Sequence, residues 1–138
     1  NDLQTDLSPK GEKLISEYIK GEFNSDFVFI THYPQNKRPM YTMPYGEGET
    51  RSFDLLFRGL EITTGGQRIH DYTQLLENIA KRGLSKEQFK DYLYIFKYGM
   101  PPHGGFAIGL ERITSMLLGF DNVRYASAFP RDKMRLTP

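Results

Sequence analysis

Residues 53–68 have the sequence FDLLFRGLEITTGGQR, which places Asp54, Glu61 and Arg68 at intervals of seven. An interval of seven corresponds to two turns along one face of a helix. The same stretch, however, contains three glycines, a Thr-Thr pair and many residues that favour strands. The composition therefore predicts a β-hairpin, with the Arg-Gly pair in its middle as a two-residue turn.

A two-residue turn at Arg58-Gly59 fixes which side chains share a face of the hairpin. Asp54 and Glu61 become diagonal neighbours on one face, roughly 7–8 Å apart at the backbone. Two carboxylates at this separation can bind one hard cation such as Mg²⁺, although a solvated surface face explains the pattern equally well. The opposite face is predicted to be core and consists of Leu55, Phe57, Leu60 and Ile62.

Arg68 needs one more structural feature to join the acidic face, because an unbroken strand would point it away from Glu61. The pair Gly65-Gly66 is a natural position for a β-bulge, which reverses the alternation of faces. Arg68 would then present a planar fork of donors suited to a carboxylate or a phosphate.

A second group of residues lies in the sequence GGFAIGLERI, residues 104–113. Gly105, Ala107 and Gly109 alternate with bulky residues, so one strand face would be nearly bare backbone. A planar ring could lie against that face. From the spacing alone, however, the favoured interpretation is that the bare face allows a helix to pack closely against the strand. A helix that opens with Arg112 in its first turn adds an anion-binding end, and together these features suggest a nucleotide.

The remaining sequence predicts a mixed α+β order of elements. Apolar periodicity and capping residues, among them Ser8 and Asp71, predict helices at residues 8–23, 72–83, 86–99 and 111–120. The first helix is expected to bury Leu14, Ile15, Tyr18 and Ile19. Further strands are expected at residues 26–34, 106–110 and 123–129, with a mobile Pro- and Gly-rich loop at residues 35–50 in which residues 40–43 could form a short strand.

The bulk composition fits one globular domain. The chain has 138 residues, a net charge of +1 and 38% hydrophobic residues, which shows no bias toward nucleic acid or membranes. No apolar run approaches the ~20 residues of a membrane span. The absence of cysteine excludes disulfides and fits a reducing cytoplasm, and three scattered histidines, His70 among them, do not form a zinc site.

Several motifs in one order resemble the C-terminal part of the catalytic domain of class II aspartyl-tRNA synthetases, most closely the archaeal and eukaryotic branch. The matching segments are SDFVFITHYP, YTMPY, GLEITTGGQRIH, YGMPPHGG, GGFAIGLERI and FPRDKMRLTP, and they extend over almost the whole chain. The resemblance implies an antiparallel β-sheet flanked by helices, with residues 1–138 as one segment of that catalytic domain. It also implies that the anticodon-binding domain and the first two class II motifs are absent from the segment.

The resemblance assigns a role to each candidate residue. Arg112 would act as the catalytic residue and contact the nucleotide, with Glu61, Gly105, Ala107 and Gly109 also in the ATP site. Asp54, Glu61 and Thr64 would hold Mg²⁺, and Arg68 with Gln67 would bind the side-chain carboxylate of L-aspartate. The expected partners are ATP, L-aspartate and, in the full-length enzyme, tRNA and a second subunit of a homodimer.

Other functions stay open at this point. The segment could belong to an asparaginyl-tRNA synthetase or to an amidating paralogue, although Arg68 favours an acidic amino acid. It could also be a non-catalytic, synthetase-like binding module. Because the α-phosphate Arg of the second motif is missing, the isolated chain is not expected to be catalytically competent.

Overall fold

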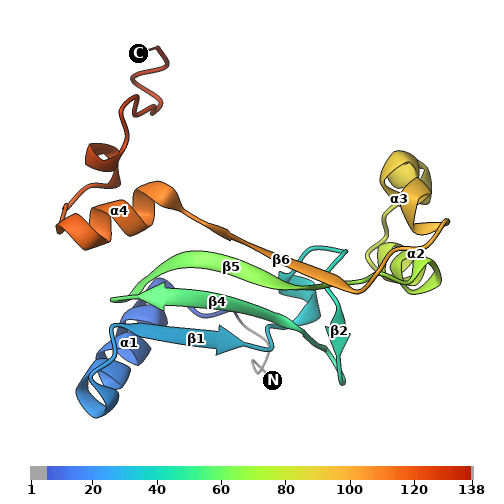
Figure 1. Cartoon of the computed structure of the whole chain (residues 1–138), viewed down its shortest axis with the longest axis horizontal. Coiled ribbons are helices and arrows are strands. Elements are labelled where there is room, and N and C mark those ends of the chain that lie inside the picture. The colour runs from blue at the N-terminus through green and yellow to red at the C-terminus, as the bar shows by residue number, and fades with distance from the viewer. Residues whose placement is uncertain (1–5, 138) are drawn as a thin grey trace. The chain divides into compact units, whose positions relative to one another are not determined.

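The computed structural model describes residues 6–137, so the ends of the predicted segment, residues 1–138, lie outside the described residues. Strands β1 (Phe27–Thr31), β4 (Ser52–Phe57), β5 (Leu60–Arg68) and β6 (His103–Ile108) form one sheet in the order β1-β4-β5-β6 (Figure 1). Strands β2 (Pro44–Tyr45) and β3 (Glu49–Thr50) form a separate antiparallel pair. The predicted α+β class with an antiparallel sheet is confirmed.

The described residues contain helices of two kinds. The α-helices are α1 (Pro9–Phe23), α2 (Tyr72–Lys81), α3 (Lys90–Phe96) and α4 (Leu110–Leu118), and the short 3-10 helices are η1 (Gln35–Lys37), η2 (Lys86–Phe89) and η3 (Val123–Ala126). None of these helices has both the length and the apolar composition that crossing a lipid bilayer requires.

The chain divides into two compact units, each of which gathers segments that are distant in sequence. Unit 1 is built mainly from Ile30–Phe53 and Gly65–Phe106, and unit 2 from Leu7–Phe29, Asp54–Thr64 and Ala107 onward. The candidate residues are therefore shared between the units. Arg68, Gln67 and Gly105 belong to unit 1, and the others belong to unit 2.

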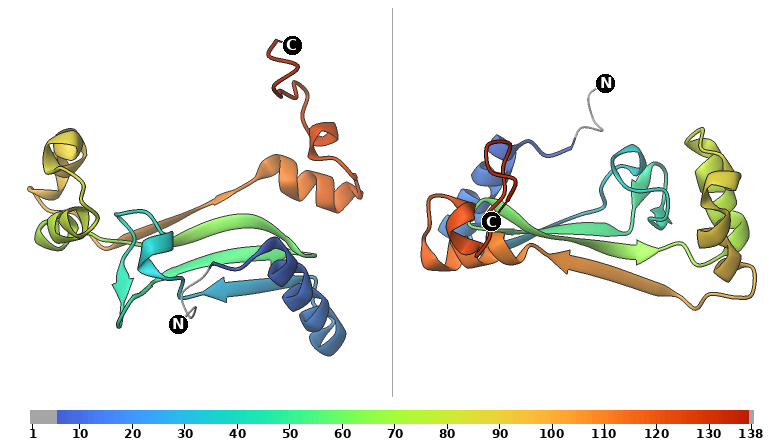
Figure 2. Two further views of the ribbon diagram at one scale, coloured as in Figure 1. Left: turned by 180° about the vertical axis from the view of Figure 1, so that it is seen from behind. Right: turned by 90° about the horizontal axis from the view of Figure 1, so that it is seen from above.

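The core of unit 1 packs helices α2 and α3, which lie side by side (Figure 2), against the segment that follows β5. Its buried side chains are Met43, Ile69, Leu75, Ile79, Leu93 and Phe96. The cap predicted at Asp71 is confirmed, since its carboxylate accepts from the backbone N of Gln74 at 2.7 Å. Met43 lies in the segment 35–50, which the sequence predicted to be a loop. In the structure this segment contains η1 and the β2–β3 pair, and residues 40–43 do not form the short strand that was considered possible.

The hairpin of unit 2 has the predicted two-residue turn. Arg58 has a φ of 49° and Gly59 a φ of 84°, as expected for the turn type that matches strand twist. A positive φ is unfavourable for Arg58, but its backbone N donates to the carbonyl O of Asp26 at 2.9 Å and its Nη2 contacts the Asp26 carboxylate at 3.0 Å. The side-chain bond from Arg58, and then the one from Lys20, holds the pKa of the Asp26 carboxyl below its usual value.

Replacing Gly59 with Ala is expected to destabilise the chain by roughly 1–2 kcal/mol, because an L-residue at this φ clashes with its own carbonyl. The new Cβ would also lie 3.3 Å from the Cα of Lys13 in α1. Gly21→Ala is the matched control, since Gly21 lies within α1 with no atom near its missing Cβ, and it should stabilise by about 0.5–1 kcal/mol. Chemical denaturation measures both, and equal midpoints for Gly59→Ala and wild type would contradict the turn assignment.

Three expectations from the sequence are wrong in detail. Helix α1 begins after its predicted cap Ser8. Its residues Leu14 and Tyr18 were expected to be buried but are more than half exposed, and the buried residue of this helix is Ser16. The helix predicted at residues 86–99 is split into η2 and α3 and ends before Gly99. The last predicted strand is instead the helix η3, because the side chain of Asn122 caps it by accepting from the N of Arg124.

Candidate functional site

Glu61 is the centre of a polar cluster in unit 2, which we call the Glu61 cluster and define as Glu61, Thr64 and Arg112. The Thr64 hydroxyl donates to Oε1 of Glu61 at 2.8 Å. Nη1 of Arg112 donates to the main-chain O of Glu61 at 2.8 Å and lies 3.7 Å from its Oε1. Three residues that the family resemblance assigns to ATP and metal binding are thus joined through Glu61.

The contact between Glu61 and Thr64 reveals an irregularity in β5. Residues three apart on a regular strand point to opposite faces, yet these two side chains are hydrogen-bonded. The two residues between them, Ile62 and Thr63, are both buried in succession. We infer that the alternation of faces is interrupted here, which is earlier in the strand than the predicted position at Gly65-Gly66. A bulge at the glycine pair itself stays a prediction.

Helix α4 positions the side chain of Arg112 beside Glu61. The backbone N of Gly109 donates to the carbonyl O of Ile62 at 2.8 Å, which ties the start of α4 to β5. The Arg112 side chain folds back over Gly109, where an added Cβ would lie 3.4 Å from Cδ of Arg112, an ordinary van der Waals contact. Ala107 precedes this point on β6 and is exposed.

Asp54 lies on β4 and is largely buried, with 6% of its surface exposed. The observed two-residue turn supports the register that puts Asp54 and Glu61 on one face, but a shared cleft stays a prediction. Within residues 6–137, no group of three or more His, Cys, Asp and Glu could hold a metal ion. Two carboxylates and the Thr64 hydroxyl are nevertheless hard oxygen donors, and Mg²⁺ commonly takes one or two carboxylates plus phosphate and water oxygens.

Arg68 lies in unit 1, at the end of β5. Its guanidinium carbon is 5.4 Å from the centroid of the Tyr41 ring. A Cβ at position 105 would lie 3.2 Å from Nη2 of Arg68, so the bare face predicted at Gly105 is the surface on which this guanidinium rests. The planar group that the glycine accommodates here belongs to the protein.

Gln67 and Arg68 are consecutive on β5, so their side chains leave opposite faces of the strand. The side-chain oxygen of Gln67 accepts from Nη1 of Arg51 at 3.0 Å. Gln67 and Gly105 also line a shallow hollow of about 480 Å³, whose wall includes Phe53, Phe106 and His103. Gly105 therefore lies near both Gln67 and Arg68, but the side chains of Gln67 and Arg68 do not lie near each other.

Sequence inspection missed three side chains around these residues, namely Tyr41, Arg51 and Tyr92. Burial raises the pKa of the Tyr92 hydroxyl, while the positive charge of Arg68 acts to lower it. His70, predicted to be structural, has a buried Nδ1 with no hydrogen-bond partner among the described residues. The only sequence signal for Tyr41 was its place in the YTMPY motif.

Comparison with known proteins identifies the family. The model for class II tRNA synthetases (D, K and N) matches residues 2–133. The chain belongs to this family. The resemblance to aspartyl-tRNA synthetases is also confirmed by individual relatives.

Two curated relatives carry the name of aspartate–tRNA ligases. The aspartate–tRNA(Asp/Asn) ligase of Thermus thermophilus is 62% identical over 96% of this chain and 32% of that protein. The aspartate–tRNA(Asp) ligase of Picrophilus torridus is 50% identical over 96% of this chain and 30% of that protein. The chain thus spans about a third of the length of these class II synthetases.

Solved class II synthetase structures agree with the fold. The aspartyl-tRNA synthetase of Entamoeba histolytica superimposes with a TM-score of 0.93 at 41% identity, covering 98% of this chain and 28% of that one. The asparaginyl-tRNA synthetase of Pyrococcus horikoshii gives 0.87 at 31% identity, covering 100% and 33%. The asparaginyl enzyme is the more distant of these two class II relatives.

Proposed function

We propose that this chain is the C-terminal part of the catalytic domain of an aspartate–tRNA ligase. The full-length protein would form aspartyl-adenylate from L-aspartate and ATP and then transfer the aspartyl group to tRNA. The observation that carries the proposal is Arg68, whose guanidinium rests on Gly105 beside Tyr41. The printed names of the aspartate–tRNA ligases, at 50% and 62% identity, support the same amino acid.

The choice of aspartate follows from the chemistry of the guanidinium. Arg has five N–H donors, no acceptor and a permanent charge, so it matches a side-chain carboxylate. Asparagine would turn its NH₂ group toward those donors and leave part of the fork unpaired. Gln67 is the second residue proposed for the aspartate site, and it lines a hollow together with Gly105.

The Glu61 cluster is proposed to bind the phosphates of ATP. Arg112 is the proposed catalytic residue, because its guanidinium can exchange its contact with Glu61 for phosphate oxygens as charge develops. Of the three small residues predicted for the ATP site, Ala107 and Gly109 would form the surface on which the nucleotide lies, whereas Arg68 already covers the bare face of Gly105. Mg²⁺ would be held by Asp54, Glu61 and Thr64, where it would neutralise phosphate charge.

The isolated chain is proposed to lack activity. Displacement at the α-phosphorus needs charge stabilisation there, and the candidate residues of this chain serve the metal, the γ-phosphate and the amino acid. The full-length protein would act as a cytoplasmic homodimer, and the absence of cysteine fits that reducing compartment.

Exchange of labelled pyrophosphate into ATP tests the proposal. The full-length protein is expected to catalyse exchange that depends on aspartate and is not supported by asparagine. The purified 138-residue chain is expected to give no exchange above background, since it lacks the α-phosphate Arg. Exchange that depends on asparagine instead would overturn the proposed substrate, and robust exchange by the isolated chain would contradict the division of roles.

A further inference from the structure

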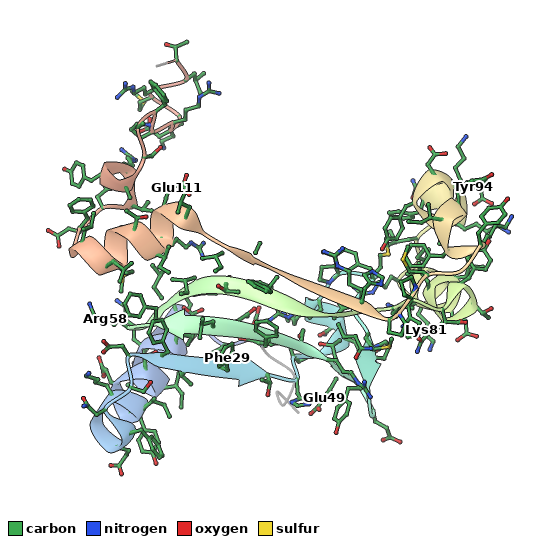
Figure 3. The ribbon with its side chains drawn as sticks, in the orientation of Figure 1. Phe29, Glu49, Arg58, Lys81, Tyr94 and Glu111 are labelled. Carbon is green, nitrogen blue, oxygen red and sulfur yellow. The ribbon has the colours of Figure 1, made fainter. Side chains whose placement is uncertain are left out.

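The helical end of unit 1 carries a basic and aromatic surface that the proposed aspartate and ATP sites do not use. Residues 81–97 contain five basic and two acidic side chains, although the whole chain has a net charge of only +1. Lys81 and Tyr94 mark this region in Figure 3, on α2 and α3. The charge is therefore concentrated locally, as in surfaces that bind polyanions.

The basic residues are arranged in a stripe. Lys86, Lys90, Tyr94 and Lys97 follow one another at steps of four, four and three through η2 and α3, which is the spacing of a single helical face. They line one hollow of about 350 Å³ together with Tyr72 and Leu93. We call this hollow and its rim the lysine stripe.

The lysines of the stripe are available for a ligand. All three are exposed, and no acidic side chain among the described residues forms an ion pair with any of them. Glu87 lines the same hollow, but its carboxylate is bonded by the Ser85 hydroxyl. That bond, with a smaller effect from Lys86, keeps the pKa of Glu87 below its usual value.

Exposed aromatic rings accompany the charges. The Tyr94 and Tyr98 rings lie 5.1 Å apart in an edge arrangement, with their hydroxyl oxygens at 3.3 Å. Their exposed fractions are 59% and 74%. Aromatic faces beside a row of positive charges are the features with which proteins bind single-stranded RNA, since bases stack on the rings while the charges follow the phosphates.

We propose that the lysine stripe binds a single-stranded segment of RNA, with Lys86, Lys90 and Lys97 on phosphates and Tyr94 and Tyr98 stacking on bases. The inference rests on the proposed function in taking RNA as the partner, and it adds a contact surface in unit 1. It does not involve Arg68 or the Glu61 cluster.

Fluorescence anisotropy of the 138-residue chain with a labelled single-stranded RNA oligonucleotide tests the charges. Replacing Lys86, Lys90 and Lys97 with Gln is expected to weaken binding at least tenfold at low salt. It should also reduce the slope of log K against log salt by about 2, because each lost phosphate contact to a single strand removes ~0.7. The matched control replaces Lys10, Lys37 and Lys133 with Gln and is expected to change binding less than twofold.

Two aromatic variants test the stacking. Tyr94→Ala should weaken binding roughly tenfold without altering the salt slope, whereas Tyr94→Phe should retain affinity because the ring remains. Equal losses from both lysine sets, or tighter binding of duplex RNA than of single strands, would overturn the inference. Aspartate-dependent exchange by the full-length protein with the three Lys→Gln changes should be unaffected, since exchange involves no RNA. The anisotropy assay therefore tests RNA binding, and the exchange assay tests the proposed function independently of it.

Discussion

Replacing Arg68 with Lys in the full-length protein is expected to raise the KM for aspartate at least tenfold and to leave the KM for ATP within about twofold. Lys retains the positive charge but loses the planar fork that pairs with both oxygens of a carboxylate. A hydrogen bond to a charged group contributes about 1.5–3 kcal/mol, so the loss of one from the fork weakens binding tenfold or more. The loss should therefore fall on the amino acid.

The position of Arg68 makes this substitution informative. The guanidinium lies against Gly105 and beside the Tyr41 ring, and a shorter, rounder ammonium cannot fill the same planar space. Steady-state kinetics with aspartate and ATP varied in turn measure both constants. A higher KM for ATP with an unchanged KM for aspartate would show that Arg68 does not recognise the amino acid.

Replacing Arg112 with Lys is expected to have the opposite effect, with a KM for ATP raised at least tenfold and little change for aspartate. Nη1 of Arg112 contacts both the main chain and the carboxylate of Glu61. Lys would present one compact ammonium to the phosphates in place of a planar guanidinium with five N–H donors. The kcat should fall as well, because the charge of the transferring group increases in the transition state.

The two Arg→Lys variants serve as controls for each other, since they make the same chemical change in different units. A general loss of folding would lower the apparent kcat of both variants without changing either KM, and circular dichroism of each variant would detect it. Parallel effects of the two variants on ATP and aspartate, in proteins that remain folded, would contradict the separate roles of Arg68 and Arg112.

Local sequence signals predicted much of the fold. The turn at Arg58-Gly59 and the cap at Asp71 depend on neighbouring residues, so their chemistry is visible in sequence. The exposure of the apolar face of α1 could not be predicted from the sequence. The pattern of Leu14 and Tyr18 indicates an apolar stripe, but only the packing partner determines whether that stripe is buried.

The candidate site was predictable where its residues are close in the chain. The family resemblance implied a shared role for Glu61 and Thr64, and the structure joins them by a hydrogen bond. The position of the irregularity in β5 was not predictable, because glycine pairs are only one of several places where strands bulge. The contact of Arg68 with Tyr41 joins two segments by tertiary packing, and no periodic pattern in the sequence encodes it.

The most direct test of the central claim is a crystal structure of the full-length protein with L-aspartate, Mg²⁺ and a non-hydrolysable ATP analogue. The account predicts that the Arg68 guanidinium contacts the side-chain carboxylate of aspartate at about 2.7–2.9 Å, while Arg112 contacts the phosphates of the nucleotide. An aspartate bound elsewhere, with Arg68 on a phosphate or on no ligand, would contradict the claim that Arg68 selects the amino acid.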